Sequence, residues 1–216
     1  MEQVAASAPV REKLLTMSGL AEDMVDRAVK ALLEGDAELA RQVCKDDDQL
    51  DALENEVDRL VLAALRTELT EGDLRQVTLG LKISNDLERV GDQANSVAEA
   101  VIHLSQRKDW QAPLRHEIVA MGEKSCLMLR EACRAFSEND VSLARQLINQ
   151  DDQMDALRES HQDTLVKLMQ SDTESISFYL NLGDIIKRLE RVADHATNVA
   201  EGVLFMNRSG EETGAA

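Results

Sequence analysis

Apolar residues recur at intervals of three and four positions along most of the chain, as Ile83, Leu87 and Val90 illustrate. This is the period of a helix that buries one face, so the pattern favours helices over strands. Short polar breaks, such as residues 70–73 and 171–174, divide the pattern into six segments. We expect helices at 11–34, 37–68, 74–106, 114–137, 141–170 and 175–206.

Several of the expected helix ends carry residues that stop or cap helices. Gly35 and Asn139 are of the types that end helices, and the aspartates that follow them, Asp36 and Asp140, are typical N-caps. Pro113 suits the first turn of the helix expected after it. The connections are therefore short, and helices joined by short connections pack as antiparallel neighbours.

The chain also contains an internal repeat of about 100 residues. Residues 87–92 (LERVGD) return as 189–194 (LERVAD) at an offset of 102, and 48–53 (DQLDAL) return as 152–157 (DQMDAL) at an offset of 104. Two blocks matched in the same order indicate a duplicated unit of three helices. We expect an all-α fold of two tandem three-helix bundles with approximate internal twofold symmetry, with domains at 11–107 and 113–206 and a disordered tail at 207–216.

Composition narrows the classes of function. Aromatic residues make up 2% of the chain, which disfavours a sheet or barrel core, and the net charge of -17 opposes binding to nucleic acid or to anionic membranes. Three cysteines without close spacing describe no disulfide framework. We see neither a signal peptide nor an apolar run long enough to span a membrane, so we expect a cytoplasmic protein.

Acidic residues form stripes along the second and third helices of each expected unit. Positions i, i+4, i+7 and i+11 share one helix face, and Asp47, Asp51, Glu54 and Asp58 occupy that series. The other stripes contain Glu88, Asp92, Glu99, Asp151, Asp155, Glu159, Glu190, Asp194 and Glu201.

Like charges four residues apart destabilise a helix, and a bound cation would relieve that repulsion. Oxygen ligands of this kind suit hard ions such as Mg, Mn or Fe, and sometimes Ca. Two alternatives remain open: the stripes are solvated faces, or Arg89 and Arg191 pair with acids of an adjacent helix. His195 offers a nitrogen ligand beside Asp194, although a surface or capping role is the simpler interpretation.

Residues 189–201 (LERVADHATNVAE) closely resemble the signature third helix of PhoU proteins, and 87–99 look like a weaker form of it. The resemblance covers roughly 12–206 and includes Met-Ser-Gly at 17–19 and Asp-Leu-Arg at 73–75. PhoU-like proteins are pairs of three-helix bundles whose E(D)xxxD motifs can bind multinuclear metal clusters. The resemblance implies divalent or trivalent ions such as Fe, Mn, Mg or Zn, held by Asp47, Asp51, Glu88, Asp92, Asp151, Asp155, Glu190 and Asp194.

The chain departs from the family pattern at several positions. Gln93 replaces the usual histidine of the first unit, and Ser96 stands where the family has asparagine. Arg158 lies at the position that Glu54 occupies in the first unit. The loop before Asp73 lacks a proline.

The resemblance implies a negative regulator of the phosphate-starvation response and of phosphate uptake. Such a protein is an adaptor between the ATPase subunit of the phosphate ABC transporter and a sensor histidine kinase, and we expect it to form a homodimer. We expect no enzyme, since the sequence has no nucleophile elbow, P-loop or Ser-His-Asp pattern. The alternatives are an accessory subunit of another phosphate permease, a metal-handling bundle (although the Glu-x-x-His motif of ferritin-like sites is absent) and a plain helical scaffold.

Overall fold

The computed structural model describes residues 7–105 and 115–207, so the expected linker proline and the expected tail beyond residue 207 lie outside the described residues. Residue 207, which we expected in the tail, is the last residue of a helix. The described elements are α1 (Ala8–Glu34), α2 (Ala37–Ala64), α3 (Glu71–Leu104), α4 (Arg115–Glu138), α5 (Val141–Ile148), α6 (Asp151–Ser171), the short 3₁₀ helix η1 (Thr173–Ser175) and α7 (Ile176–Asn207).

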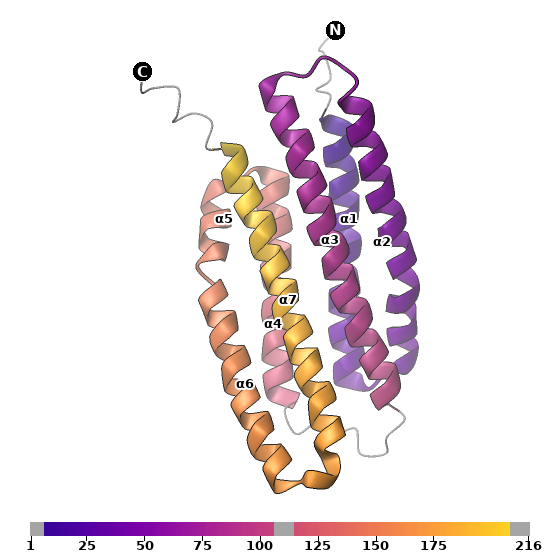
Figure 1. Cartoon of the computed structure of the whole chain (residues 1–216), viewed down its shortest axis with the longest axis vertical. Coiled ribbons are helices and arrows are strands. Elements are labelled where there is room, and N and C mark those ends of the chain that lie inside the picture. Colours follow the sequence, from indigo (N-terminus) through magenta and orange to yellow (C-terminus); the bar gives the residue numbers. More distant parts are fainter. Residues whose placement is uncertain (1–6, 106–114, 208–216) are drawn as a thin grey trace.

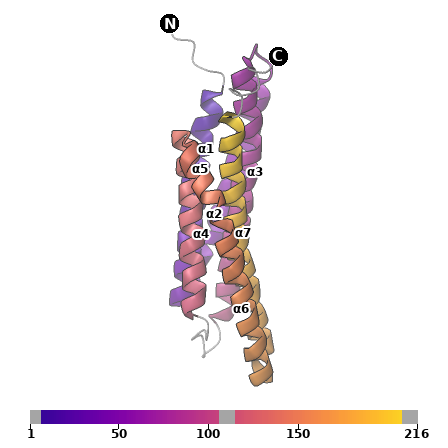
Figure 2. The same cartoon turned by 90° about the vertical axis from the view of Figure 1, so that its left-hand side faces the viewer.

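The helices run along the long axis of the molecule as two bundles placed side by side (Figure 1). Helices α1, α2 and α3 form the first bundle, and α4, α7 and the pair α5 and α6 form the second. Helix α3 packs on α7 and α1 packs on α4, so the seam between the bundles joins equivalent helices of the two units. The turned view in Figure 2 shows α6 and the adjoining part of α7 reaching beyond the end of α4. The prediction of an all-α fold is confirmed.

Polar contacts across the seam repeat the internal symmetry. His195 Nδ1 lies 2.9 Å from Asp86 Oδ1, and Arg188 donates a hydrogen bond to Gln93 Oε1 at 3.3 Å. The sequence offset of 102 relates Asp86 to Arg188 and Gln93 to His195, so each contact occupies the place of the other after exchange of the two units. The two contacts therefore lie at equivalent positions of the two units, although the residue types that form them differ.

The apolar faces predicted from the spacing form the core. Ile83, Leu87 and Val90 of α3 are each at most 1% exposed, as are Leu189 and Val192 of α7. The buried apolar side chains of both bundles make one continuous cluster. None of the described helices combines the length and the apolar composition needed to cross a bilayer.

The predicted stop and cap residues occupy those roles. Gly35 ends α1 with a left-handed φ of 67°, which glycine adopts without a steric penalty, and Asn139 has a φ of 55°. Asp36 accepts hydrogen bonds from two backbone N–H groups in the first turn of α2, and Asp140 does the same for α5.

The ends of the connection between α2 and α3 differ from the expected ones. Helix α2 ends at Ala64, four residues early, because the Thr67 hydroxyl donates to the Ala64 carbonyl at 2.7 Å and the chain turns there. Helix α3 begins at Glu71, three residues early. Thr70 caps it by accepting from the Asp73 N–H at 3.1 Å, so the stretch that we read as a polar break contains a capping motif.

The single helix predicted at 141–170 is wrong, since the structure has two helices separated by Asn149 and Gln150. The Gln150 N–H bonds at 2.8 Å to the carbonyl three residues back, which tightens the turn and interrupts the α-helical ladder. The Gln150 side chain accepts from Lys124 Nζ at 2.5 Å and donates to Glu131 at 3.2 Å, both on α4. Asparagine is a weak helix former, and these contacts fix the interruption in place.

Candidate functional site

Five carboxylates gather where α2 lies against α3, and we call them the first acidic cluster: Asp47, Asp51, Glu54, Glu88 and Asp92. The cluster joins the two helices directly. Asn95 of α3 donates a hydrogen bond from Nδ2 to Asp47 Oδ2 of α2 at 2.6 Å. The acidic stripes predicted for the second and third helices of the first unit therefore face one another.

The acids of the first cluster act electrostatically on each other. Burial raises the pKa of Asp47, and the neighbouring charges of Asp51 and Asp92 raise it further, while the hydrogen bond from Asn95 opposes them. Burial likewise raises the pKa of Glu88, with the Asp92 charge as the next cause. Both effects disfavour the charged form, so the folded protein holds these carboxylates at an energetic cost.

Two oxygen atoms in this region are buried without a hydrogen-bond partner: Glu88 Oε2 and Asn95 Oδ1. Arg89 pairs with acids of its own helix, and lies 3.4 Å from Glu88 Oε2 and 3.0 Å from Asp92 Oδ2. Its side chain is 51% exposed, so it lies at the rim of the cluster. The oxygen donors of the first acidic cluster therefore fit a hard cation in chemistry.

The second acidic cluster consists of Asp151 and Asp155 of α6 with Glu190 and Asp194 of α7. The Thr197 hydroxyl donates to Asp151 Oδ1 at 3.3 Å. This contact is equivalent to that of Asn95 with Asp47, since Thr197 follows Asn95 by 102 residues and Asp151 follows Asp47 by 104. Burial raises the pKa of Glu190, with the Asp194 charge second, and burial raises the pKa of Asp194, with Asp151 and Asp155 next.

Every carboxylate that the family resemblance pointed to thus lies in one of the two clusters. Within residues 7–105 and 117–207, however, no group of three or more histidine, cysteine, aspartate or glutamate side chains is arranged to hold a metal ion. The carboxylates are neighbours, but their side chains do not form a ligand set. Metal binding therefore stays a prediction for these residues.

The raised pKa values give the metal-free protein a defined dependence on pH. A carboxyl whose pKa is higher in the folded than in the unfolded chain binds its proton more tightly when folded, so protonation stabilises the fold. Stability should rise as the pH falls from neutral through the raised folded values toward the ordinary values of 3.8 and 4.5. We expect the melting temperature in a metal chelator to be a few degrees higher at pH 5 than at pH 7.5.

The double variant Glu88→Gln and Glu190→Gln provides the control for this prediction. It removes one carboxyl with a raised pKa from each cluster. The melting temperature of the variant should therefore change less between the two pH values than that of the wild type. Calorimetry of both proteins at the two pH values checks the result. An equal change in the variant would assign the effect to the net charge of the chain.

The described histidines do not join the acidic clusters. His195, which we considered as a nitrogen ligand, faces Asp86 across the seam. His161 is buried with Nδ1 3.1 Å from Met121 Sδ, and burial lowers its pKa. His103 is exposed near the end of α3.

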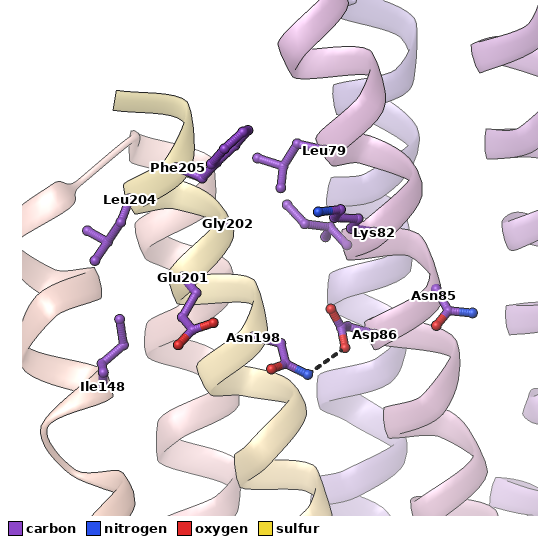
Figure 3. A pocket seen from close by; sticks show the side chains of 11 residues that line it. Leu79, Lys82, Asn85, Asp86, Ile148, Asn198, Glu201, Gly202, Leu204 and Phe205 are labelled. Atoms are coloured by element: carbon purple, nitrogen blue, oxygen red, sulfur yellow. Dashed lines mark hydrogen bonds between the residues drawn. The ribbon is translucent and has the colours of Figure 1, made fainter. Parts of the chain in front are cut away.

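A pocket of about 670 Å³ opens at the seam between α3 and α7 (Figure 3). At one end Asn198 donates a hydrogen bond to Asp86 at 3.0 Å. At the other end Lys82 Nζ lies over the ring of Phe205, 5.9 Å from the ring centre. Phe205 is 56% exposed. Glu201, which we placed in an acidic stripe, lines this pocket and lies outside the second acidic cluster.

Reasoning from the sequence missed the polar residues of the seam: Asp86, Arg188 and Asn198. The repeat could have revealed them, because Asp86 corresponds to Arg188 and Gln93 corresponds to His195 in the other unit. In each contact across the seam, the two residues can form a hydrogen bond or an ion pair. Recognising this requires knowing that α3 packs on α7, which the linear pattern does not state.

Comparison with known proteins gives consistent results. The PhoU domain family matches residues 14–101 and 118–203. The Pseudomonas aeruginosa "phosphate-specific transport system accessory protein PhoU homolog" is 36% identical over 92% of this chain and 82% of its own, and a homologue of the same name from Clostridium acetobutylicum is 29% identical over 91% and 90%.

Two crystal structures share the fold. PhoU from Pseudomonas aeruginosa superposes with a TM-score of 0.90 at 35% identity, covering 93% of this chain and 96% of that one. The "phosphate transport system regulatory protein PhoU" from Streptococcus pneumoniae gives 0.86 at 26% identity, covering 94% and 95%. These relatives are named as accessory or regulatory proteins. With two family matches that span most of its length, the chain belongs to the PhoU family.

Proposed function

We propose that the protein is a cytoplasmic negative regulator of phosphate uptake and of the phosphate-starvation response. The observation that carries the proposal is family membership over nearly the whole chain, since the related proteins are named for accessory and regulatory roles in phosphate transport. The protein acts as an adaptor between the ATPase subunit of a phosphate ABC transporter and a sensor histidine kinase, and keeps signalling off when phosphate is abundant.

The physical character of the chain suits an adaptor. A net charge of -17 repels nucleic acid and anionic lipid and attracts basic protein surfaces. We propose that it works as a homodimer, which light scattering of the purified protein would show as twice the chain mass of 23.9 kDa.

We also propose that the first acidic cluster binds a hard divalent or trivalent cation. Support comes from its donor set, from the buried Glu88 Oε2 that has no hydrogen-bond partner, and from the repulsion that adds to burial in raising the pKa of Asp47 and Glu88. A bound cation would neutralise that repulsion and fix α2 against α3. Its role is to hold a surface in shape, so no reaction is assigned to it.

A phosphate-starvation reporter tests the regulatory role. In cells that lack this gene, alkaline phosphatase activity in phosphate-rich medium should reach the level that the parent strain shows only under starvation. The intact gene should restore repression. A variant with Asp92→Ala and Asp194→Ala, one substitution in each acidic cluster, should restore it only in part if the clusters shape the partner surface.

An unchanged reporter in the deletion strain would contradict the regulatory role. The rate of phosphate uptake, measured in the same strains, then separates the alternatives. A changed uptake rate with normal repression would identify an accessory subunit of another phosphate permease. Normal uptake with normal repression would leave a metal-handling or structural bundle.

A further inference from the structure

A guanidinium group lies inside the second acidic cluster. Arg158 of α6 places its Nε 3.0 Å from Glu190 Oε1 of α7, with the two side chains only 32% and 16% exposed. The contact is an ion pair and not an aligned hydrogen bond, because Nε has no partner at hydrogen-bond geometry. Arg158 also donates to Gln162 on its own helix at 3.5 Å, and it lines an open groove of about 630 Å³ between α6 and α7.

The first acidic cluster has a carboxylate at the equivalent place. The repeat offset of 104 relates Arg158 to Glu54, whose charge adds to the repulsion on Glu88. Arg89 lies at the rim of the first cluster and forms its ion pairs along α3, with Glu88 and Asp92, although its charge also acts on Glu54 of α2. The helix-crossing position is therefore acidic in one unit and basic in the other.

The two clusters consequently differ in their balance of charge. The first has five carboxylates against the single guanidinium of Arg89. The second has four carboxylates, and Arg158 and Arg191 both lower the pKa of Glu190. A metal ion entering the second cluster would have to displace Arg158 from Glu190 and would be repelled by it, whereas the ion pairs of the first cluster stay within α3.

We infer that Arg158 is the built-in cation of the second acidic cluster, so that the second unit is neutralised by its own side chain and only the first unit depends on a bound metal ion. This inference rests on the proposed cation binding by the first cluster. It gives the duplicated units different tasks: the contact between α6 and α7 is permanently neutralised, and the contact between α2 and α3 responds to the metal supply.

The test is the number of Mn²⁺ ions bound per chain, measured by equilibrium dialysis and by electron paramagnetic resonance of the full-length protein. Arg158→Glu places in the second unit the glutamate that the first unit has at Glu54. This variant should bind about twice as many Mn²⁺ ions per chain as the wild type. Glu54→Arg transfers the arginine to the first cluster and should remove most of the binding. Lys167→Glu makes the same charge change on an exposed part of α6, about 13 Å along the helix, and should leave the number unchanged.

Each outcome separates the inference from the proposal beneath it. Wild-type binding that falls by half on Asp155→Asn with Asp194→Asn, and does not rise on Arg158→Glu, would overturn the role of Arg158 while leaving cation binding intact. If the Arg158→Glu variant binds Mn²⁺ and the wild type does not, the role of Arg158 is supported and cation binding by the first acidic cluster is contradicted. If neither the wild type nor the Arg158→Glu variant binds Mn²⁺, the inference about Arg158 and the proposed cation site are both overturned. If Arg158→Glu does not fold, by circular dichroism, Arg158→Gln should still increase the number bound, and an unchanged number there would count against the inference.

Discussion

We expect Gly91→Val to lower the free energy of unfolding by about 3 kcal/mol, because it inserts a branched side chain where α3 packs tightly against α2. Gly91 is buried on α3, and a Cβ atom there would overlap Leu50 Cδ2 and lie 3.6 Å from Asp47 Oδ1. Leu50 is fully buried, so it can make room only by repacking against its neighbours in the core. The substitution would therefore push the two helices apart at the first acidic cluster. Urea denaturation measures the effect.

Gly19→Val is the matched control. Gly19 lies on an exposed face of α1 and a Cβ atom there would meet nothing within 4 Å. Because glycine is a poorer helix former than valine, this substitution should leave stability unchanged or raise it slightly. Equal unfolding midpoints for the two variants would show that α2 and α3 do not approach as closely at Gly91 as described.

Much of the architecture was predictable because it depends on local and periodic features. The repeat, the buried faces of α3 and α7, and the stop and cap residues at Gly35 and Asp140 follow from residue type and spacing alone. These features require no knowledge of which helices touch. For the same reason the acidic stripes were visible before the structure, since side chains four residues apart share a helix face whatever the fold.

The features that were missed depend on contacts between elements. The interruption at Gln150 is fixed by Lys124 and Glu131 of α4, and neither is near it in the sequence. The pairing of Arg158 with Glu190 likewise requires that α6 lie against α7 in one register. The sequence alone identified Arg158 as a departure from the repeat. Its partner Glu190 could be identified only from the tertiary structure.

A divalent cation should stabilise the protein strongly if the first acidic cluster binds it. At a free Mn²⁺ concentration about 100 times the dissociation constant, binding to the folded state alone adds about 2.7 kcal/mol, which corresponds to a rise in melting temperature of roughly 5–10 °C for a chain of this size. Scanning calorimetry against a chelator, with sodium chloride added to equal ionic strength, separates this effect from charge screening.

The variant with Asp51→Asn and Glu88→Gln should respond in two opposite ways. Without metal it should be more stable than the wild type, since it removes two neighbouring negative charges, one of which is held with a raised pKa. With Mn²⁺ it should lose most of the gain, because two oxygen ligands no longer carry charge. The exposed pair Glu12→Gln and Glu138→Gln removes the same charge elsewhere and should keep the full gain. An equal gain in all three proteins would mean that Mn²⁺ acts on the net charge and that the first acidic cluster is a solvated surface.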